Sequence, residues 1–191
     1  MGRYSTRFTG FFISCLLLAG CSGGGDPSSI APTAPIPPMP LGRPDSRIVG
    51  FAYVPNAFGN NISAYTIKAN GSLSPVGAPV GTGSVPWGAV VDPKGKFVYV
   101  TNHGTGNVSA YAINTASGAL TQVQGSPFAA GANPTSVAID PTGNFAYVGD
   151  IGNGSSGNVS AFAINAGSGA LTPVQGSPFL AGRHPFDVTV R

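Results

Sequence analysis

Few residues of this chain could carry out catalysis, and the densest group of them lies near residue 191. Arg183, His184 and Asp187 fall within five residues of one another. A hydrolytic site needs a general base that ionises near neutral pH and a cation that stabilises an oxyanion. These three residues are therefore a candidate catalytic group. The alternative is that His103 and His184, the only two histidines, are polar loop residues.

A second set of residues has the chemistry of a binding surface and comprises Trp87, Asn102, His103 and Asp150. Trp87 is the only tryptophan of the chain. Tryptophan lies more often in the core than at a ligand, but at the mouth of a channel it can stack on a sugar or another ring. We take these four as the candidate binding residues. The expected ligand is a small molecule or a protein.

The sequence lacks the residues that several other kinds of site need. It has no G-x-S-x-G element, no nucleophilic cysteine and no phosphate-binding loop with its lysine. All six acidic residues are aspartates, and two histidines in different repeats with one aspartate match no metal-ligand spacing. We expect no metal and no cofactor.

The net charge of +3 does not indicate nucleic-acid binding. Two of the nine basic residues, Arg3 and Arg7, lie in an N-terminal segment that we expect to be removed. Seven basic residues then face six aspartates, which leaves a net charge of +1, and the basic residues are scattered singly. A nucleic-acid interface needs a basic patch, so we expect no nucleic-acid partner.

An internal repeat determines where the candidate residues lie. The stretch GALTQVQGSPF at 118–128 returns as GALTPVQGSPF at 169–179, and the wider segments 86–133 and 134–184 share one pattern. Each segment holds four short apolar runs separated by turn residues, and within the runs the residues alternate in polarity or size. Short alternating strands at a period near 50 residues predict a four-stranded antiparallel unit, the blade of a β-propeller.

The blade pattern sends the loops alternately to opposite ends of the fold. The loop after the second strand and the loop after the fourth strand share one end, which collects Trp87, Asn102, His103, Asp150, Arg183 and His184. The opposite end holds Asp-Pro turns such as Asp140 to Gly143. A proline at the second position of the turn and a glycine at the fourth are typical of a type I turn. We therefore interpret Asp92 and Asp140 as turn formers.

The repeat resembles a known family. FVYVTN at 97–102 contains the Tyr-Val-Thr-Asn signature of YVTN-repeat proteins, and DPKGKFVYV, NVSAYAI and GALTQV resemble the lactonase-like β-propellers related to 6-phosphogluconolactonase. The resemblance covers residues 47–191 and implies an all-β propeller of four-stranded blades. That family includes lactone hydrolases, and its typical ring has seven blades, so the resemblance also implies a lactonase as one candidate activity.

The sequence predicts only about three blades. The first unit, from residue 47, lacks its first strand, and HPFDVTVR at 184–191 matches that strand alone. Propellers usually need four to eight blades to close around a channel. Two interpretations follow: the chain is a truncated relic of a longer gene, or two copies join head to tail as a homodimer that closes a six-bladed ring.

The N-terminus resembles a bacterial lipoprotein signal. Arg3 and Arg7 precede an apolar stretch that is too short to span a bilayer, and Leu18-Ala19-Gly20-Cys21 resembles a lipobox. The resemblance implies cleavage before Cys21 and acylation of its thiol, which would anchor the protein in a membrane. An ordinary signal peptide with a chance cysteine is the alternative. A serine after the cysteine, here Ser22, resembles the pattern of outer-membrane lipoproteins. The resemblance implies that the protein is anchored in the outer membrane and faces the periplasm or the exterior.

These patterns divide the chain into three parts. Residues 1–20 are the expected signal peptide, 21–46 hold the anchor cysteine and a tether rich in Pro, Gly and Ser, and 47–191 hold the propeller repeats. The favoured function is a non-catalytic binding or assembly module in the bacterial cell envelope, because residues that could carry out catalysis are sparse. The alternative is a lactone hydrolase, which rests on the family resemblance.

Overall fold

The computed structural model describes residues 46–154 and 156–191, and every regular element of this part of the chain is a β-strand. The all-β prediction is confirmed. Within the same residues no helix has the length and apolar character needed to cross a membrane. The expected signal peptide and the anchor Cys21 lie outside the described residues, as does the tether except for Ser46.

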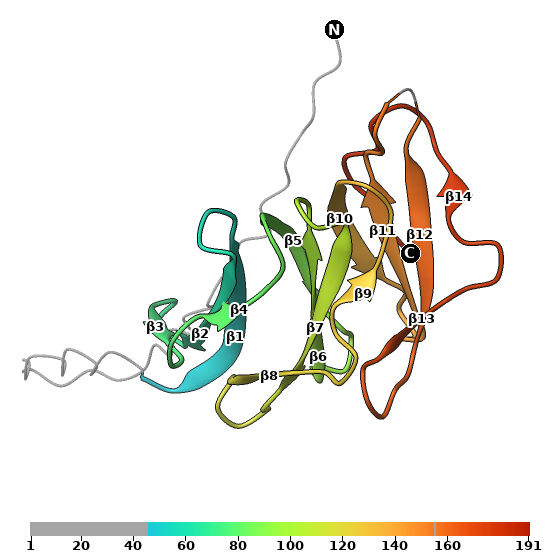
Figure 1. The fold of residues 1–191 in the computed structure, drawn as a ribbon. Helices are drawn as coiled ribbons and strands as arrows, with labels where there is room; N and C mark the ends of the chain where they lie inside the picture. The colour runs from blue at the N-terminus through green and yellow to red at the C-terminus, as the bar shows by residue number, and fades with distance from the viewer. Residues whose placement is uncertain (1–45, 155) are drawn as a thin grey trace, which may run out of the picture. The chain divides into compact units, whose positions relative to one another are not determined.

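The strands form three antiparallel sheets, which we call the first, second and third blade and which lie side by side in chain order (Figure 1). The first blade contains β1 (Ile48–Asn56), β2 (Asn61–Lys68), β3 (Leu73–Pro75) and β4 (Val80–Gly81). The second contains β5 (Pro86–Val91), β6 (Phe97–Asn102), β7 (Asn107–Ile113), β8 (Leu120–Gln122) and β9 (Phe128–Ala129). The third contains β10 (Pro134–Ile139), β11 (Phe145–Asp150), β12 (Asn158–Ile164), β13 (Leu171–Pro173) and β14 (Phe179–Leu180).

The repeated GSPF stretch divides the outer strand of a blade into two pieces. β8 and β9 both pair with β7, and β13 and β14 both pair with β12. Between the pieces, the hydroxyl of Ser126 accepts a 2.9 Å hydrogen bond from the N–H of Ala110, and Ser177 does the same for Ala161. The serine thus satisfies a donor on the neighbouring strand where the outer strand is interrupted.

The two Asp-Pro turns are confirmed as structural. The N–H of Gly143 donates to the carbonyl of Asp140 at 2.9 Å, as the type I turn requires. The Asp140 carboxylate accepts from the N–H groups of Asn144 and Phe145 at 2.8 and 2.7 Å. Asp92 repeats this arrangement in the second blade, so both aspartates close the hairpin between the first two strands of their blades.

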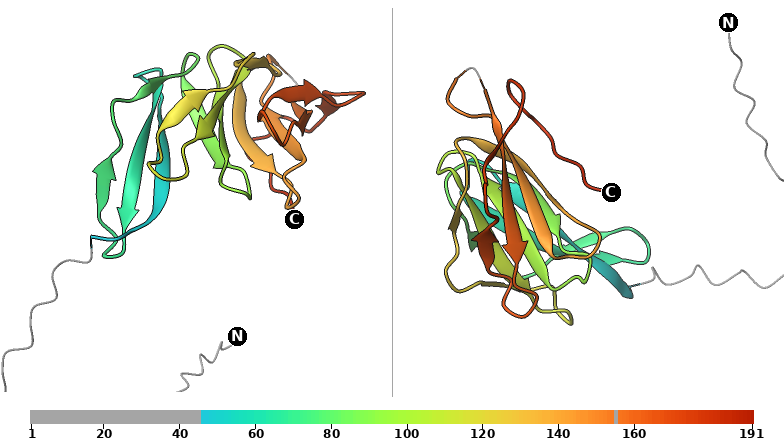
Figure 2. Two further views of the ribbon diagram at one scale, coloured as in Figure 1. Left: turned by 90° about the horizontal axis from the view of Figure 1, so that it is seen from below. Right: turned by 90° about the vertical axis from the view of Figure 1, so that its right-hand side faces the viewer.

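The prediction of a strand at 184–191 is wrong for this structure, because these residues are described but form no strand. The first blade lacks the first of its four strands, as predicted, so β1 lies at the edge of the sheet and, among the described residues, pairs only with β2. A strand at 184–191 would need the edge of another sheet to pair with. The segment lies instead beside the third blade (Figure 2), where the hydroxyl of Thr135 donates to the carbonyl of Pro185 at 3.3 Å.

The core lies between neighbouring blades. One buried cluster joins the second and third blades and includes Tyr99, Val108, Val148 and Phe162. A smaller one joins the first and second blades and includes Ile62, Val100 and Tyr111. Each blade therefore depends on its neighbour to bury one apolar face, as the propeller pattern predicts.

Candidate functional site

Three aromatic rings from separate segments meet at the end of the fold that holds the loops after β6 and before β5. Trp87 lies in β5, His103 directly follows β6, and Phe186 lies in the segment after the third blade. The Trp87 and His103 ring centroids are 4.6 Å apart, and those of Trp87 and Phe186 are 6.4 Å apart in an edge-on arrangement. Trp87 is 50% and Phe186 63% exposed, so these rings present an aromatic surface to solvent.

A hollow of about 340 Å³ adjoins Trp87. Its lining consists of Pro55, Ala57, Phe58, Val85, Pro86 and Trp87, none of which carries a charge. Phe58 is fully exposed and forms one wall. Exposed aromatic side chains around an uncharged hollow are a common setting for a ring-shaped neutral ligand. We call Trp87, His103, Phe58 and Phe186 the aromatic surface.

A strained backbone at Val85 positions both the hollow and His103. Val85 has a φ of +52°, which a β-branched residue rarely adopts. Two hydrogen bonds of 2.9 Å hold it there: its N–H donates to Oδ1 of Asn60, and its carbonyl accepts from the N–H of His103. These hydrogen bonds hold the Val85 side chain in the wall of the hollow and fix the loop that carries His103.

The structure does not place Asn102 and Asp150 on this aromatic surface, because both side chains are fully buried. Nδ2 of Asn102 donates to Oδ1 of Asn107 at 2.7 Å and to the hydroxyl of Ser109 at 2.9 Å. In the third blade the hydroxyl of Ser160 donates to Oδ2 of Asp150 at 2.6 Å. Both residues therefore link their second and third strands, so of the four candidate binding residues only Trp87 and His103 meet.

Asp150 differs from its counterparts in the other two blades, which are Asn56 and Asn102. Burial raises the pKa of the Asp150 carboxyl to about 6, and the hydrogen bonds from Ser160 and from the N–H of Gly131 oppose that rise without cancelling it. Its Oδ1 is buried and has no hydrogen-bond partner. A carboxyl group with this pKa could exchange protons near neutral pH, but its burial keeps it from a bound substrate.

Arg183, His184 and Asp187 are not assembled into a catalytic group. All three side chains are exposed, and no hydrogen bond or ion pair joins them to one another. Oδ1 of Asp187 accepts a hydrogen bond from the N–H of Val188. His184 has a φ of +51°, as expected for a polar residue in a tight loop. The described residues also contain no group of three or more His, Cys, Asp or Glu that could hold a metal ion.

Sequence reasoning missed two residues of the aromatic surface, Phe58 and Phe186, and it missed Val85 in the wall of the adjoining hollow. Phe186 could have been found, because it occupies the position after the repeated proline that Trp87 occupies in the second blade. No comparable signal marks Phe58 or Val85. Their role depends on the loop between β1 and β2 approaching the start of β5, which the repeat pattern does not specify.

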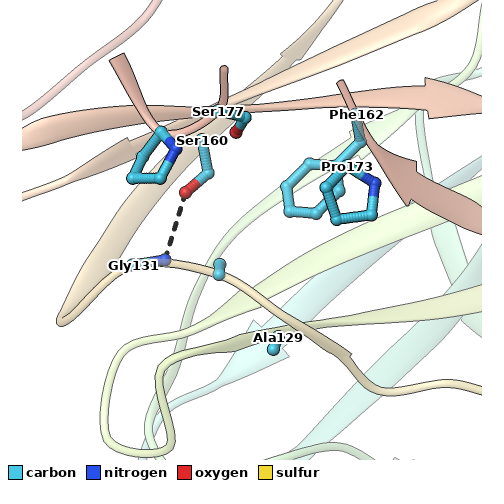
Figure 3. Close-up of a pocket in the computed structure, with 8 residues that line it drawn as sticks. Ala129, Gly131, Ser160, Phe162, Pro173 and Ser177 are labelled. Carbon is cyan, nitrogen blue, oxygen red and sulfur yellow. Dashed lines mark hydrogen bonds between the residues drawn. The ribbon is translucent and has the colours of Figure 1, made fainter. Parts of the chain in front are cut away.

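A second, smaller hollow of about 130 Å³ lies between the second and third blades (Figure 3). Residues 129–131 of the second blade form one side, and Ser160, Phe162, Pro173 and Ser177 of the third blade form the other. The N–H of Gly131 donates to the hydroxyl of Ser160 at 3.1 Å across it. This hollow lies at the contact between two blades.

A family model described as lactonase, seven-bladed beta-propeller, matches residues 46–129 and again residues 90–190. Together the two ranges span all three blades. The chain belongs to this lactonase-like propeller family. The resemblance predicted from the repeat is confirmed. No curated protein sequence gives a match.

Solved structures share the lactonase-like fold with this chain. A candidate 6-phosphogluconolactonase from Bacteroides uniformis matches with a TM-score of 0.62 and 21% identity over 72% of this chain and 40% of its own. The periplasmic gluconolactonase of Pseudomonas aeruginosa matches with a TM-score of 0.56 and 22% identity over 75% of this chain and 44% of its own. This lactonase-like chain thus spans less than half of the length of these structures, and identities this low show the fold alone.

Proposed function

We propose that this lactonase-like chain is a non-catalytic binding module of the bacterial cell envelope and that its aromatic surface binds a neutral, ring-shaped ligand such as a sugar. The observation that carries the proposal is the half-exposed Trp87, which lies beside an uncharged hollow and contacts the rings of His103 and Phe186. Burying an exposed indole against a sugar ring removes apolar surface from water, which favours binding.

The proposal includes the location of the module. Cleavage before Cys21 and acylation of its thiol would anchor the chain, and the tether of residues 21–46 would hold the propeller repeats away from an outer membrane. Labelling with a radioactive fatty acid tests this part. The unaltered chain should carry the label in membranes, whereas Cys21→Ser should remain unlabelled; equal labelling of both would refute the anchor.

The ligand proposal is tested by calorimetry with neutral pyranosides, such as methyl glucoside and methyl galactoside, as probes. Binding should saturate, and Trp87→Ala should weaken it roughly five- to thirtyfold, since a stacked ring contributes on the order of 1–2 kcal/mol. Phe179→Ala is the matched control, because it removes a half-exposed ring from β14, away from this surface. Equal binding by Trp87→Ala and the parent chain would refute the site.

A lactone hydrolase is the second candidate, and family membership supports it. Acid release from glucono-δ-lactone, followed at constant pH, distinguishes the two. The binding module should release acid no faster than the spontaneous reaction. Hydrolysis that the protein accelerates and that His184→Ala abolishes would instead establish the enzyme, with Arg183 and Asp187 as the residues to test next.

A further inference from the structure

Neighbouring blades meet through one contact that occurs twice. The hydroxyl of Tyr53 in the first blade donates to the carbonyl of Gly118 in the second at 3.1 Å. The hydroxyl of Tyr99 in the second blade donates to the carbonyl of Gly169 in the third at 3.0 Å. Each glycine also lies against a phenylalanine ring two residues before the tyrosine, so closely that a methyl group would overlap it.

The third blade carries one unmatched half of this contact. Phe145 and Tyr147 occupy in β11 the positions that Phe97 and Tyr99 occupy in β6. Phe145 is 39% exposed, whereas Phe97 is 6% exposed. The difference has a simple cause, because no blade follows the third one in the described structure.

The first blade carries the other half. Gly71 has the turn position of Gly118 and Gly169 and a similar φ of +81°. Apart from its two chain neighbours, however, no described residue has an atom within 4 Å of where its Cβ would be. Two residues later, Leu73 is 53% exposed, whereas its counterpart Leu171 in the third blade is 5% exposed in the core. A glycine and a leucine that are covered in the later blades are thus open in the first.

The hollow in Figure 3 is also covered in a later blade and open in the first blade. Residues 129–131 of the second blade lie across the third blade at Ser160 and Phe162 and leave about 130 Å³. The first blade has a hollow at the equivalent residues, with Ser63, Tyr65, Pro75 and Pro79 in its lining. Its volume is larger, about 240 Å³, because no preceding blade covers it.

The segment that would fill the open hollow lies at the other end of the row of blades. Residues 180–182 of the third blade are the equivalents of 129–131, and Leu180 is 86% exposed. Segment 184–191 also has no strand partner, and β1 has an unpaired edge. In the second blade β5 pairs with β6, and Val90 lies opposite Tyr99. Thr189 and Tyr53 occupy the positions of Val90 and Tyr99 in the repeat. A strand at 184–191 that paired with β1 would therefore place Thr189 opposite Tyr53.

We infer that the third blade of one copy packs on the first blade of a second copy. Phe145 and Tyr147 would contact Gly71 of the second copy, and Leu180 would enter its open hollow. The two surfaces differ, so the contact is heterologous, and two such contacts would close a six-bladed ring. None of the residues named at the contact carries a charge, and Phe145, Leu180 and Leu73 are apolar, which suits burial of the two surfaces against each other. The inference does not depend on a ligand.

The test is the mass in solution of the full chain carrying Cys21→Ser, measured by light scattering behind a sizing column over a range of concentrations. A mass of two or more chains of 19.0 kDa is expected. Leu180→Asp should raise the dissociation constant at least about tenfold, because it places an unpaired charge in the contact. Leu73→Asp on the other surface should do the same.

Mixing the two variants separates a head-to-tail contact from any other. Each variant retains the surface that the other has lost, so an equimolar mixture should regain a dimer with one intact contact. Thr121→Asp is the control, because it adds the same charge to an exposed position of β8 in the second blade and should leave the mass unchanged. Circular dichroism checks that each variant is folded.

Three results would overturn the inference. The first is a monomer at every concentration, and the second is an oligomer that neither Leu180→Asp nor Leu73→Asp weakens. The third is a mixture of these two variants that remains monomeric although both are folded. Ligand binding by such a monomer would leave the proposed function intact, so the two proposals fail separately.

Discussion

The hydroxyl of Ser160 donates a 2.6 Å hydrogen bond to Oδ2 of Asp150, while the other carboxylate oxygen is buried without a partner. In the second blade the same position is Asn102, whose Nδ2 donates to both Asn107 and Ser109. An amide thus supplies two donors at a site where a carboxylate supplies none. Oδ1 of Asn102 is likewise buried without a partner, so the two blades differ in charge and donors: the third buries an ionisable acid where the second buries a neutral amide.

This difference predicts that Asp150→Asn stabilises the protein at neutral pH. Burial raises the pKa of Asp150 from 3.8 to about 6 in the folded chain, so the unfolded chain ionises first as the pH rises. The free energy of unfolding should therefore fall between pH 4 and pH 6 and remain lower above that range. Urea unfolding at pH 7 should show a gain of roughly 1–3 kcal/mol for Asp150→Asn, with a smaller pH dependence.

The reciprocal substitution is the control. Asn102→Asp should destabilise the second blade at pH 7, since it removes two donated hydrogen bonds and buries a charge. Equal stability of Asp150→Asn and the parent chain at both pH 5 and pH 7 would show that Asp150 is not held in a costly environment.

Gly169→Ala should destabilise the chain more than Gly71→Ala. Both glycines have positive φ, which costs alanine about 1 kcal/mol. At Gly169 the added methyl group would also overlap the Phe97 ring, which should bring the total to roughly 2–4 kcal/mol. Thermal unfolding measures both, with Leu180→Asp present so that self-association does not contribute. Equal losses would mean that the joint between blades can relax.

Asp92→Ala should cost roughly 2–4 kcal/mol in urea unfolding, because the N–H groups of Lys96 and Phe97 lose their acceptor beside the core. Asp140→Ala should cost less, since the corresponding hydrogen bonds in the third blade are exposed to water. The opposite order would contradict the assignment of Asp92 as a buried turn former.

Val85→Asn should stabilise the chain yet weaken ligand binding. Asparagine tolerates positive φ better than a β-branched residue, and Asn133 occupies the equivalent position before β10 with a φ of +55°. Stability should rise by roughly 0.5–1 kcal/mol, while the loss of an apolar wall should reduce the pyranoside affinity. A variant with unchanged affinity would remove Val85 from the binding surface.

Several features of the fold could be predicted from the sequence because they depend on short stretches of chain. The alternation in FVYVTN and the Asp-Pro-x-Gly turns fix strands and hairpins through neighbouring residues alone, and three copies of the pattern predict three blades. The strand predicted at 184–191 failed for the opposite reason. A strand exists only where an edge is available, and that edge belongs to a sheet elsewhere.

The candidate site shows the same division. Trp87 and His103 could be placed at one end of the fold because alternating loops put them there, whereas Asn102 and Asp150 share that end but point into the blade. Whether a polar side chain at the end of a strand faces solvent or a neighbouring serine depends on the packing of the third strand. Loop position alone therefore could not separate the exposed pair from the buried one.

The sequence by itself determined the strands, turns, repeat unit and family of this protein, because these follow from local alternation and from repetition. Only the tertiary structure decided which residues form the aromatic surface, which acid is buried, and which faces of the first and third blades remain uncovered. These depend on contacts between segments far apart in the chain, such as Val85 with His103 and Tyr99 with Gly169. No local pattern encodes how closely such segments approach.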